Sequence, residues 1–185
     1  MKKRVWKLCI DFQREEAWLN KMSAKGYALT GFCLGLYTFE ASRPGKYIYR
    51  IELLKQHPGH SESQSYLEFM AEAGVEVVAT WWRWVFFRKE AACGNFEIYS
   101  DIESLLEHYR RVALLLLSVF CLQFSVALRG LCHISDALHG VRGPGNMFQI
   151  AMCLPAMLIG AALFAVWLRV RRKMWRLKRE NKVRE

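Results

Sequence analysis

The chain has 185 residues, of which 53% are hydrophobic and 24% are charged. This composition excludes a mainly disordered protein, because the chain can bury a substantial core. The formal net charge is +10. Residues 1–108 contain 14 Lys and Arg and 14 Asp and Glu, whereas residues 109–185 contain 13 and 3. Because the surplus positive charge flanks two apolar stretches, the pattern is typical of a membrane protein rather than of a basic nucleic-acid-binding surface.

The first hundred residues alternate between strand and helix patterns. Apolar and polar side chains alternate over residues 3–12 and 46–54, which predicts two half-buried strands. Helices are predicted over residues 14–25 and 61–73, where apolar residues recur at helical spacing and a glycine follows each helix. The remaining predicted elements are strands over residues 27–40, 75–89 and 96–99 and a helix over residues 102–111.

The order of these elements is strand-helix-strand-strand-helix-strand, followed by an extra strand and a helix. This order is typical of the α+β ferredoxin-like fold, in which an antiparallel sheet carries two helices on one face. Ser42-Arg43-Pro44-Gly45 has the composition of a turn, so we expect the strands on either side of it to pair as a hairpin. The predicted sheet then has one face that its helices leave uncovered.

Aromatic residues are concentrated in the predicted strand 75–89, whose two faces are both apolar. An uncovered aromatic face indicates a partner, a dimer interface, a ligand pocket or contact with the membrane. Two alternatives stay open: residues 96–111 fold back over this face, or the domain lies against the bilayer with Trp81 or Trp82 among the headgroups. The residues that we assign to the open face are Phe32, Leu34, Trp82, Trp84 and Phe86.

Motifs of catalysis and metal binding are absent from the sequence. No P-loop, GxSxG, HExxH or Rossmann glycine pattern occurs, so we expect neither an enzyme nor a cofactor. Asp11, Glu15 and Glu16 form an acidic group, but Glu15 and Glu16 fit the start of a helix equally well. The six cysteines are scattered without a CxxC pair, which indicates free thiols and no metal site. The neutral N-terminal region lacks an RNP pattern, which argues against direct binding of nucleic acid.

Two apolar stretches, at residues 112–128 and 150–168, are each long enough to span a membrane as a helix. Positive charge is concentrated outside the pair of stretches and is sparse between them. The positive-inside rule therefore places both termini in the cytoplasm. The residues that we assign to the membrane interface are Arg110, Arg111, Arg169, Arg171, Arg172, Lys173 and Trp175.

These patterns divide the chain into a domain, a membrane hairpin and a tail. The helix at 102–111 can run straight into the first span, so a change at the membrane could reach the domain through it. The predicted segments are a cytoplasmic ferredoxin-like domain (1–101), a linking helix (102–111), transmembrane helices (112–130 and 150–168), an extracytoplasmic loop between them (131–149) and a basic cytoplasmic tail (169–185).

Several motifs follow one another along residues 5–111: Asp11-Phe12, Ala17-Trp18-Leu19-Asn20-Lys21-Met22, Pro44-Gly45-Lys46-Tyr47, Phe69-Met70-Ala71-Glu72-Ala73-Gly74, Trp84-Val85-Phe86-Phe87-Arg88-Lys89 and Phe96-Glu97-Ile98-Tyr99. In this order they resemble the bacterial family of domains of unknown function numbered 2812. The resemblance implies a cytoplasmic domain followed by membrane helices and encoded beside PadR-type transcriptional repressors. It implies no catalytic residues. Val75 stands where members often have a tryptophan after the glycine.

These observations lead to the hypothesis of a regulatory or sensory binding protein, anchored by two helices in a bacterial cell membrane. Its aromatic sheet face would bind a protein partner, and the resemblance makes a PadR-type repressor a candidate. One alternative is a domain that binds a small apolar ligand. Another is an accessory subunit of a transporter or other membrane complex. A homodimer is compatible with each of these hypotheses.

Overall fold

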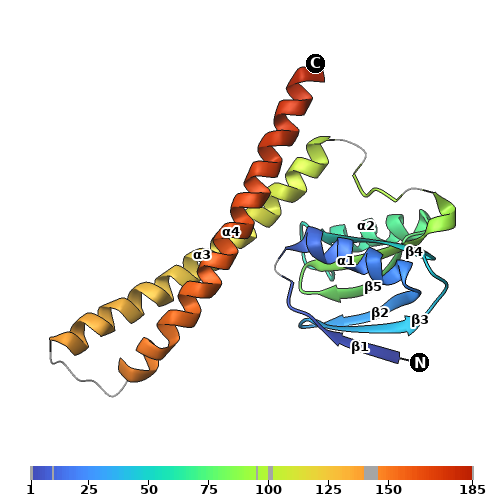
Figure 1. Cartoon of the computed structure of the whole chain (residues 1–185). Helices are drawn as coiled ribbons and strands as arrows, with labels where there is room; N and C mark the ends of the chain where they lie inside the picture. Colours follow the sequence, from blue (N-terminus) through green and yellow to red (C-terminus); the bar gives the residue numbers. More distant parts are fainter. Residues whose placement is uncertain (1, 10, 95, 100–101, 140–145, 185) are drawn as a thin grey trace. The chain divides into compact units, whose positions relative to one another are not determined.

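The computed structural model describes residues 2–9, 11–94, 96–99, 102–139 and 146–184, and the chain forms two compact units (Figure 1). The first unit, Met1–Ser104, is a mixed α and β fold, and the second, Leu105–Glu185, consists of two long helices. The predicted combination of an α+β region and two apolar helices is therefore confirmed. Ile10 and residues 140–145, which fall in the predicted first strand and in the predicted loop, lie outside the described residues.

The first unit contains two antiparallel sheets of three strands. Strands β1 (Lys2–Trp6), β2 (Tyr27–Cys33) and β3 (Leu36–Ala41) form one sheet in the order β1-β3-β2. The other sheet has the order β4-β6-β5. Its strands are β4 (Tyr47–Leu53), β5 (Glu76–Trp81) and β6 (Trp84–Glu90), and the helices of the unit are α1 (Phe12–Ala24), α2 (Ser61–Glu72) and the short 3₁₀ helix η1 (Ala91–Cys93).

Two predicted strands, 27–40 and 75–89, are each a hairpin of two strands. Their turns contain Leu34 and Trp82, which adopt left-handed backbone with φ of 46° and 55°. Sequence patterns concealed these turns because the residues there are apolar, whereas glycine or asparagine is usual at such positions. The predicted pairing of 27–40 with 46–54 is wrong, since β4 pairs with β6. The two-sheet topology does not confirm the ferredoxin-like arrangement, and residues 96–99 form no strand.

The first unit is an internal repeat of a strand-helix-strand-strand motif. The motif β1-α1-β2-β3 and the motif β4-α2-β5-β6 have the same strand order and the same antiparallel pairing. Each β-hairpin has a bulge at the equivalent place, after the pair Leu29–Phe39 in one and after Val77–Phe87 in the other. Each helix is followed by a glycine at positive φ, Gly26 and Gly74 respectively, as predicted.

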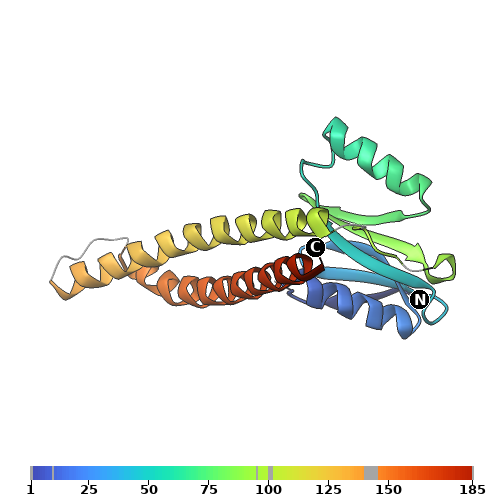
Figure 2. The ribbon, with the colours of Figure 1, turned by 90° about the horizontal axis from the view of Figure 1, so that it is seen from above.

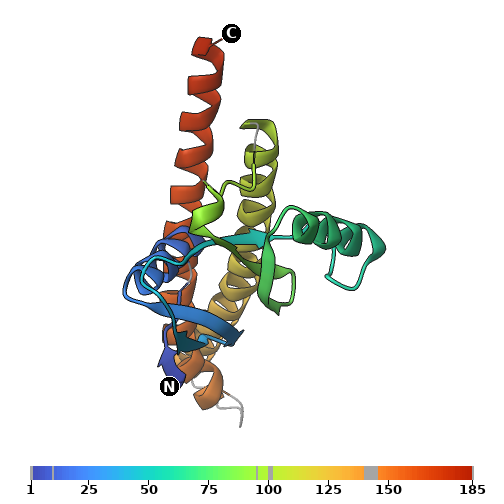
Figure 3. The same cartoon turned by 90° about the vertical axis from the view of Figure 1, so that its right-hand side faces the viewer.

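The two sheets lie side by side, with β2 next to β5. Arg88 of β6 donates a hydrogen bond from Nη1 to the carbonyl oxygen of Leu29 in β2, at 3.2 Å. This contact leaves β1 and β4 as the outermost strands. The helices α1 and α2 lie on opposite sides of the strands (Figures 2 and 3). The core beside α1 contains Leu19, Met22, Leu29, Tyr37, Phe39, Tyr49, Ile51 and Phe86, and the core beside α2 contains Leu54, Met70, Val75, Val85, Phe87 and Phe96.

The second unit is a pair of helices, α3 (Ile102–Leu138) and α4 (Asn146–Arg184). Within them, Ile102–Ser135 and Ala151–Arg179 are long and apolar enough to cross a membrane. Only 22% and 29% of their most apolar windows are buried within the protein, as expected for helices that contact lipid rather than for the core of a soluble domain. Residues 131–138 and 146–149, which were expected in the loop, are helical.

Candidate functional site

Of the five residues predicted on an open sheet face, Phe86 lies in the core, and Phe32 and Trp84 are partly buried against it. Phe86 is 2% exposed, and its ring centroid is 4.6 Å from that of Phe32. Trp84 packs at the same core, with its ring 5.9 Å from that of Phe12 in α1. These aromatic side chains fill the space between α1 and the two sheets. The prediction of an open aromatic face is therefore wrong for Phe86, and Phe32 and Trp84 are only partly exposed.

The opposite face of the second sheet, which carries Val85 and Phe87, is also covered, whereas the expectation that residues 96–111 cover the face of Phe86 is not confirmed. Phe96 is buried and Ile98 is partly buried, and both pack with Val85 and Phe87 of β6. The segment after η1 thus returns over the sheet next to α2. Because Phe96 precedes the second unit in the chain, this cover belongs to the first unit itself.

Large apolar side chains are instead exposed at one end of the first unit. Trp6, at the end of β1, pairs with Leu36, and the Lys7 amide donates to the carbonyl oxygen of Gly35 at 2.8 Å. The turns of the two hairpins lie at this same end, because the ring centroids of Phe32 and Trp81, each beside its turn, are 6.2 Å apart. We call this end the hairpin-tip surface; it comprises Trp6, Leu8, Leu34, Leu36, Trp81 and Trp82.

Basic side chains surround the hairpin-tip surface. Arg83, in the β5–β6 turn, donates to the carbonyl oxygens of Leu54 and Lys55, and its guanidinium lies 5.6 Å from the ring centroid of Trp82. Lys55 is exposed. The ammonium group of Lys7 lies 4.1 Å from the ring centroid of Trp18. The surface therefore combines exposed indole and leucine side chains with three cationic groups.

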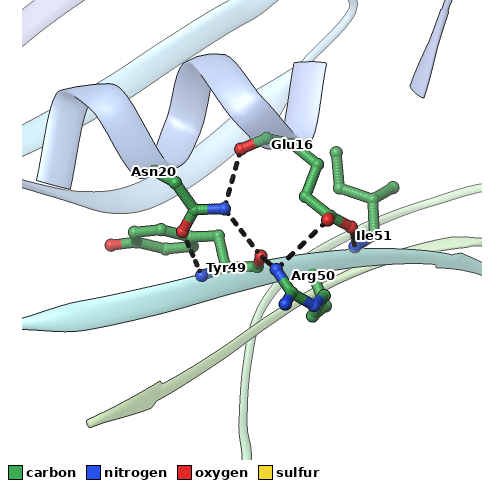
Figure 4. A network of polar contacts seen from close by, with 5 residues as sticks. All are labelled: Glu16, Asn20, Tyr49, Arg50 and Ile51. Carbon is green, nitrogen blue, oxygen red and sulfur yellow. Dashed lines mark hydrogen bonds and ion pairs between the residues drawn. The ribbon is translucent and has the colours of Figure 1, made fainter. Parts of the chain in front are cut away.

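The outer edge of β4 is sealed by polar side chains of α1 (Figure 4). Asn20 accepts from the Tyr49 amide through Oδ1 at 2.8 Å and donates from Nδ2 to the Tyr49 carbonyl at 3.1 Å. Glu16 accepts from the Ile51 amide through Oε2 at 3.2 Å, and its Oε1 pairs with Arg50 at 3.2 Å. These side chains occupy the positions that a neighbouring strand would take, so the edge cannot pair with another chain.

Ser23 continues the seal by one further turn of α1. Its hydroxyl donates to the Tyr47 carbonyl at 2.6 Å and accepts from the Tyr47 amide at 3.3 Å. Glu16, Asn20 and Ser23 therefore lie along one side of the helix and meet alternate residues of the strand. No sequence motif indicated a role for Asn20 or Ser23, although their helical spacing beside the apolar stripe places them on one side of α1.

The outer edge of β1, the equivalent edge in the other half of the repeat, is open. In the strand order of the described residues β1 has β3 as its sole neighbour. By the repeat, α2 would have to seal β1, but its residues equivalent to Glu16, Asn20 and Ser23 are exposed. These residues are Gln64, Glu68 and Ala71, and α2 packs on the second sheet instead.

The alternation of hydrogen bonds identifies which groups of β1 face outward. In an antiparallel pair, hydrogen-bonded and non-hydrogen-bonded residue pairs alternate. Because the Lys7 amide bonds to Gly35, the pair Val5–Tyr37 is hydrogen-bonded as well. The main-chain N–H and C=O of Arg4 therefore point away from β3. The same reasoning from the Leu54–Arg83 bond predicts outward groups at Tyr49 and Ile51 of β4, which are those that α1 seals.

A buried carboxyl group lies on α1, on the side that faces the first sheet. Glu15 accepts a hydrogen bond from the Tyr37 hydroxyl. Burial raises the pKa of Glu15 to about 7, against the opposing effects of the Tyr37 hydrogen bond and the Lys7 charge. Burial also raises the pKa of Cys9, and the charge of Glu15 adds to this effect. Among the described residues no cluster of three His, Cys, Asp or Glu could hold a metal ion.

The residues predicted at the membrane interface lie on the helices of the second unit. Trp175 is exposed on α4, and the Arg171 guanidinium lies 5.3 Å from the Trp167 ring centroid. On α3, Arg111 pairs with Glu107 at 3.5 Å. The basic segment that follows the apolar stretch continues α4 without a break; its predicted interface residues, Arg169, Arg171, Arg172 and Lys173, are exposed, as is Arg110 of α3.

Comparison with known proteins finds one matching family model, described as a protein of unknown function (DUF2812), over residues 11–121. The match begins at the N-cap of α1, covers both halves of the repeat from there on, and ends within α3. The comparisons with curated proteins and with solved structures gave no match.

Proposed function

The chain belongs to the DUF2812 family of proteins of unknown function, and we propose that it is a membrane-anchored regulatory protein whose first unit holds a protein partner. The observation that carries the proposal is the open outer edge of β1, set against the sealed outer edge of β4. An open edge presents main-chain donors and acceptors on which an extended peptide segment can add a further strand. Because β1 and β4 occupy equivalent positions in the repeat, the comparison shows that only one of the two edges is free of α1 or α2 side chains among the described residues.

The positive charge on β1 favours a partner segment that carries negative charge. Lys2, Lys3 and Arg4 are exposed along the strand. Lys2 pairs with Glu40 at 3.6 Å, which shows that an acidic side chain on a neighbouring strand fits beside it. Lysine on an edge also disfavours pairing with a second copy of the same basic strand. We therefore propose that an acidic extended segment of a different protein binds here.

The helices α3 and α4 support an anchoring role for the second unit. Their apolar stretches can cross a membrane, and the exposed cluster from Arg169 to Lys173 favours a cytoplasmic position for the end of α4. We propose a bacterial cell membrane with both termini in the cytoplasm. A PadR-type repressor is the first candidate partner, as the family resemblance suggests, and its capture at the membrane would keep it away from DNA.

Proline at position 4 provides a test that acts on the main chain. Because the Arg4 N–H points away from β3, Arg4→Pro removes an outward donor and leaves the pairing with β3 in place. Arg4→Ala is the matched control, which removes the charge but keeps the N–H. We expect Arg4→Pro to weaken partner binding at least tenfold, or about 1.4 kcal/mol, and Arg4→Ala to weaken it less.

The partner is identified by crosslinking the full-length protein in its native membrane and analysing co-purified proteins by mass spectrometry. A soluble DNA-binding repressor that is lost with Arg4→Pro supports the proposal. Equal capture by Arg4→Pro and wild type contradicts the β1 edge as the binding site. Capture of integral membrane proteins alone contradicts the regulatory proposal.

One observation favours a second candidate function, that of an accessory subunit of a membrane complex. A cavity of about 320 Å³ lies between α3 and α4. Its lining is apolar except for Gln123 and includes the small residues Ala127 and Gly160. Small residues allow a further helix to approach closely, and a glutamine side chain can hydrogen-bond to it within lipid. Gln123→Leu should then release integral membrane partners without affecting a soluble partner.

A further inference from the structure

We propose that the hairpin-tip surface binds the surface of an anionic lipid bilayer. This surface meets the end of β1 at Trp6 and does not include Arg4, the position at which the proposed edge binding is tested. Trp6, Leu34 and Trp82 are 69%, 67% and 52% exposed. Exposed apolar groups of this size, gathered at one end, mark a site of interaction with a protein or a membrane. Four features of the surface favour lipid.

The first feature is the type of side chain. Tryptophan and leucine at the tips of turns can enter the boundary between headgroups and acyl chains, where the indole N–H still meets polar groups. The turns are short and project from paired strands, so the side chains at their tips point outward at one end of the unit. A protein partner of comparable affinity would need a complementary hollow, whereas a bilayer adapts to projecting groups.

The second feature is the backbone at the two tips. Leu34 and Trp82 stand at equivalent places in the two halves of the repeat, and both have positive φ. Large side chains rarely adopt this conformation, which favours glycine or asparagine. Both positions nevertheless carry a bulky apolar residue that stays exposed. A binding role for the exposed side chains would explain why backbone strain is kept at both tips.

The third feature is charge. Lys7, Lys55 and Arg83 lie around the tips, and the partners of Arg83 include uncharged main-chain carbonyl groups. The pairing of basic side chains with exposed tryptophan is typical of proteins that lie on anionic membranes.

The fourth feature is the short covalent connection to the apolar helices. The first unit ends at Ser104, and the apolar stretch of α3 begins eight residues later, at Val112. If α3 spans the bilayer, the first unit cannot move far from its surface. A tether of this length gives the tips a high effective concentration at the membrane, so a weak intrinsic affinity for lipid is sufficient.

The test uses the full-length protein in nanodiscs of mixed phosphatidylcholine and phosphatidylglycerol, with 5-fluorotryptophan in place of tryptophan. Fluorine NMR signals of Trp6 and Trp82 are assigned by replacing each with phenylalanine. We expect a nitroxide on the lipid headgroup to broaden both signals and a water-soluble gadolinium chelate to have little effect. Broadening should decrease in discs of phosphatidylcholine alone; if it is the same in both discs, the anionic part of the proposal is wrong.

The matched variants separate the lipid contact from folding. Leu34→Asn combined with Trp82→Asn places at both tips a residue that tolerates positive φ, so the turns should keep their shape. We expect this pair of changes to reduce the lipid-dependent broadening of Trp6 several-fold. Phe69→Asn removes a similarly exposed apolar side chain on α2 and should have no effect.

Two results would overturn the proposal. If the gadolinium chelate broadens Trp6 and Trp82 and the lipid nitroxide does not, the surface faces water. If neither agent broadens them, the surface is covered by protein, either a second copy or a partner. Both results leave the β1 edge untested, so a failure here is distinguishable from a failure of the proposed function, which Arg4→Pro addresses.

Discussion

The buried carboxyl group of Glu15 makes the stability of the first unit depend on pH. Its pKa in the folded chain is about 7, against 4.5 for an ordinary glutamate. Between these values the unfolded chain loses the proton while the folded chain retains it. The folded state then binds more protons, so the free energy of unfolding falls as the pH rises. Below about pH 4.5 both states are protonated, and above about pH 7 both are charged, so the dependence is confined to this window.

We predict that Glu15→Gln abolishes this dependence. Wild-type protein should lose about 3 kcal/mol of stability between pH 4.5 and 7, from a shift of this size at 1.36 kcal/mol per unit. The variant keeps a neutral side chain of similar shape beside Tyr37. The measurement is urea unfolding of the full-length protein in detergent, followed by tryptophan fluorescence across this range. A wild-type midpoint that does not change with pH would show that Glu15 stays charged in the fold.

Alanine substitutions at Phe86 and Phe69 compare the stability contribution of a buried phenylalanine with that of an exposed one. Phe86 is 2% exposed at the junction of both sheets, whereas Phe69 on α2 is 63% exposed. We predict that Phe86→Ala destabilises the first unit by about 3–5 kcal/mol, because it leaves a cavity. Phe69→Ala should change stability by less than about 0.5 kcal/mol. Urea unfolding measures both, and a small effect at Phe86 would return it to the list of candidate surface residues.

Side chains of α1 form the main-chain hydrogen bonds that a neighbouring strand would otherwise form at the outer edge of β4. Asn20 satisfies both the N–H and the C=O of Tyr49. We predict that Asn20→Ala destabilises the first unit by about 2–3 kcal/mol, because two main-chain groups lose their partners. Asn20→Asp retains an acceptor for the Tyr49 amide but loses the donor to its carbonyl, so its effect should be smaller than that of alanine.

Hydrogen exchange at the Tyr49 amide checks this prediction directly. Exchange should be faster in Asn20→Ala than in Asn20→Asp, because only the aspartate can still accept from the amide. If both variants exchange at the wild-type rate, the amide is protected by other contacts. In that case the seal on β4 does not depend on Asn20, and the contrast with β1 becomes weaker.

The sequence predicted α1, α2 and β4 to within a few residues because their patterns are periodic and their ends carry turn chemistry. It missed the β2–β3 and β5–β6 turns because Leu34 and Trp82 are apolar residues at left-handed positions. It also could not show that Phe86 is buried, since β6 is apolar on both faces and only tertiary packing decides the environment of each. The seal on β4 joins positions distant in sequence, such as Asn20 and Tyr49, so helical spacing alone did not reveal it.

The internal repeat places two equivalent outer strands in the first unit, and their edges differ in what covers them. A duplicated motif begins with two equivalent helices and two equivalent outer strands. Here α1 closes the outer edge of β4, whereas α2 packs over the second sheet together with Phe96. The outer edge of β1 has no neighbouring strand among the described residues, and the two hairpin turns lie at one end. The differences between the two halves of the repeat thus give rise to the β1 edge that we propose as a binding site.

The proposed membrane topology predicts which cysteines react from outside the cell. Cys132 lies near the end of α3 and Cys93 in η1, and both side chains are exposed. With both termini in the cytoplasm, Cys132 is near the outer surface and Cys93 is inside. Two variants are needed, each of which retains one of the six cysteines of the chain, either Cys132 or Cys93. A membrane-impermeant maleimide should label Cys132 in intact cells. It should label Cys93 only after the membrane is opened. The opposite pattern would reverse the orientation, and labelling of both in intact cells would contradict a pair of spanning helices.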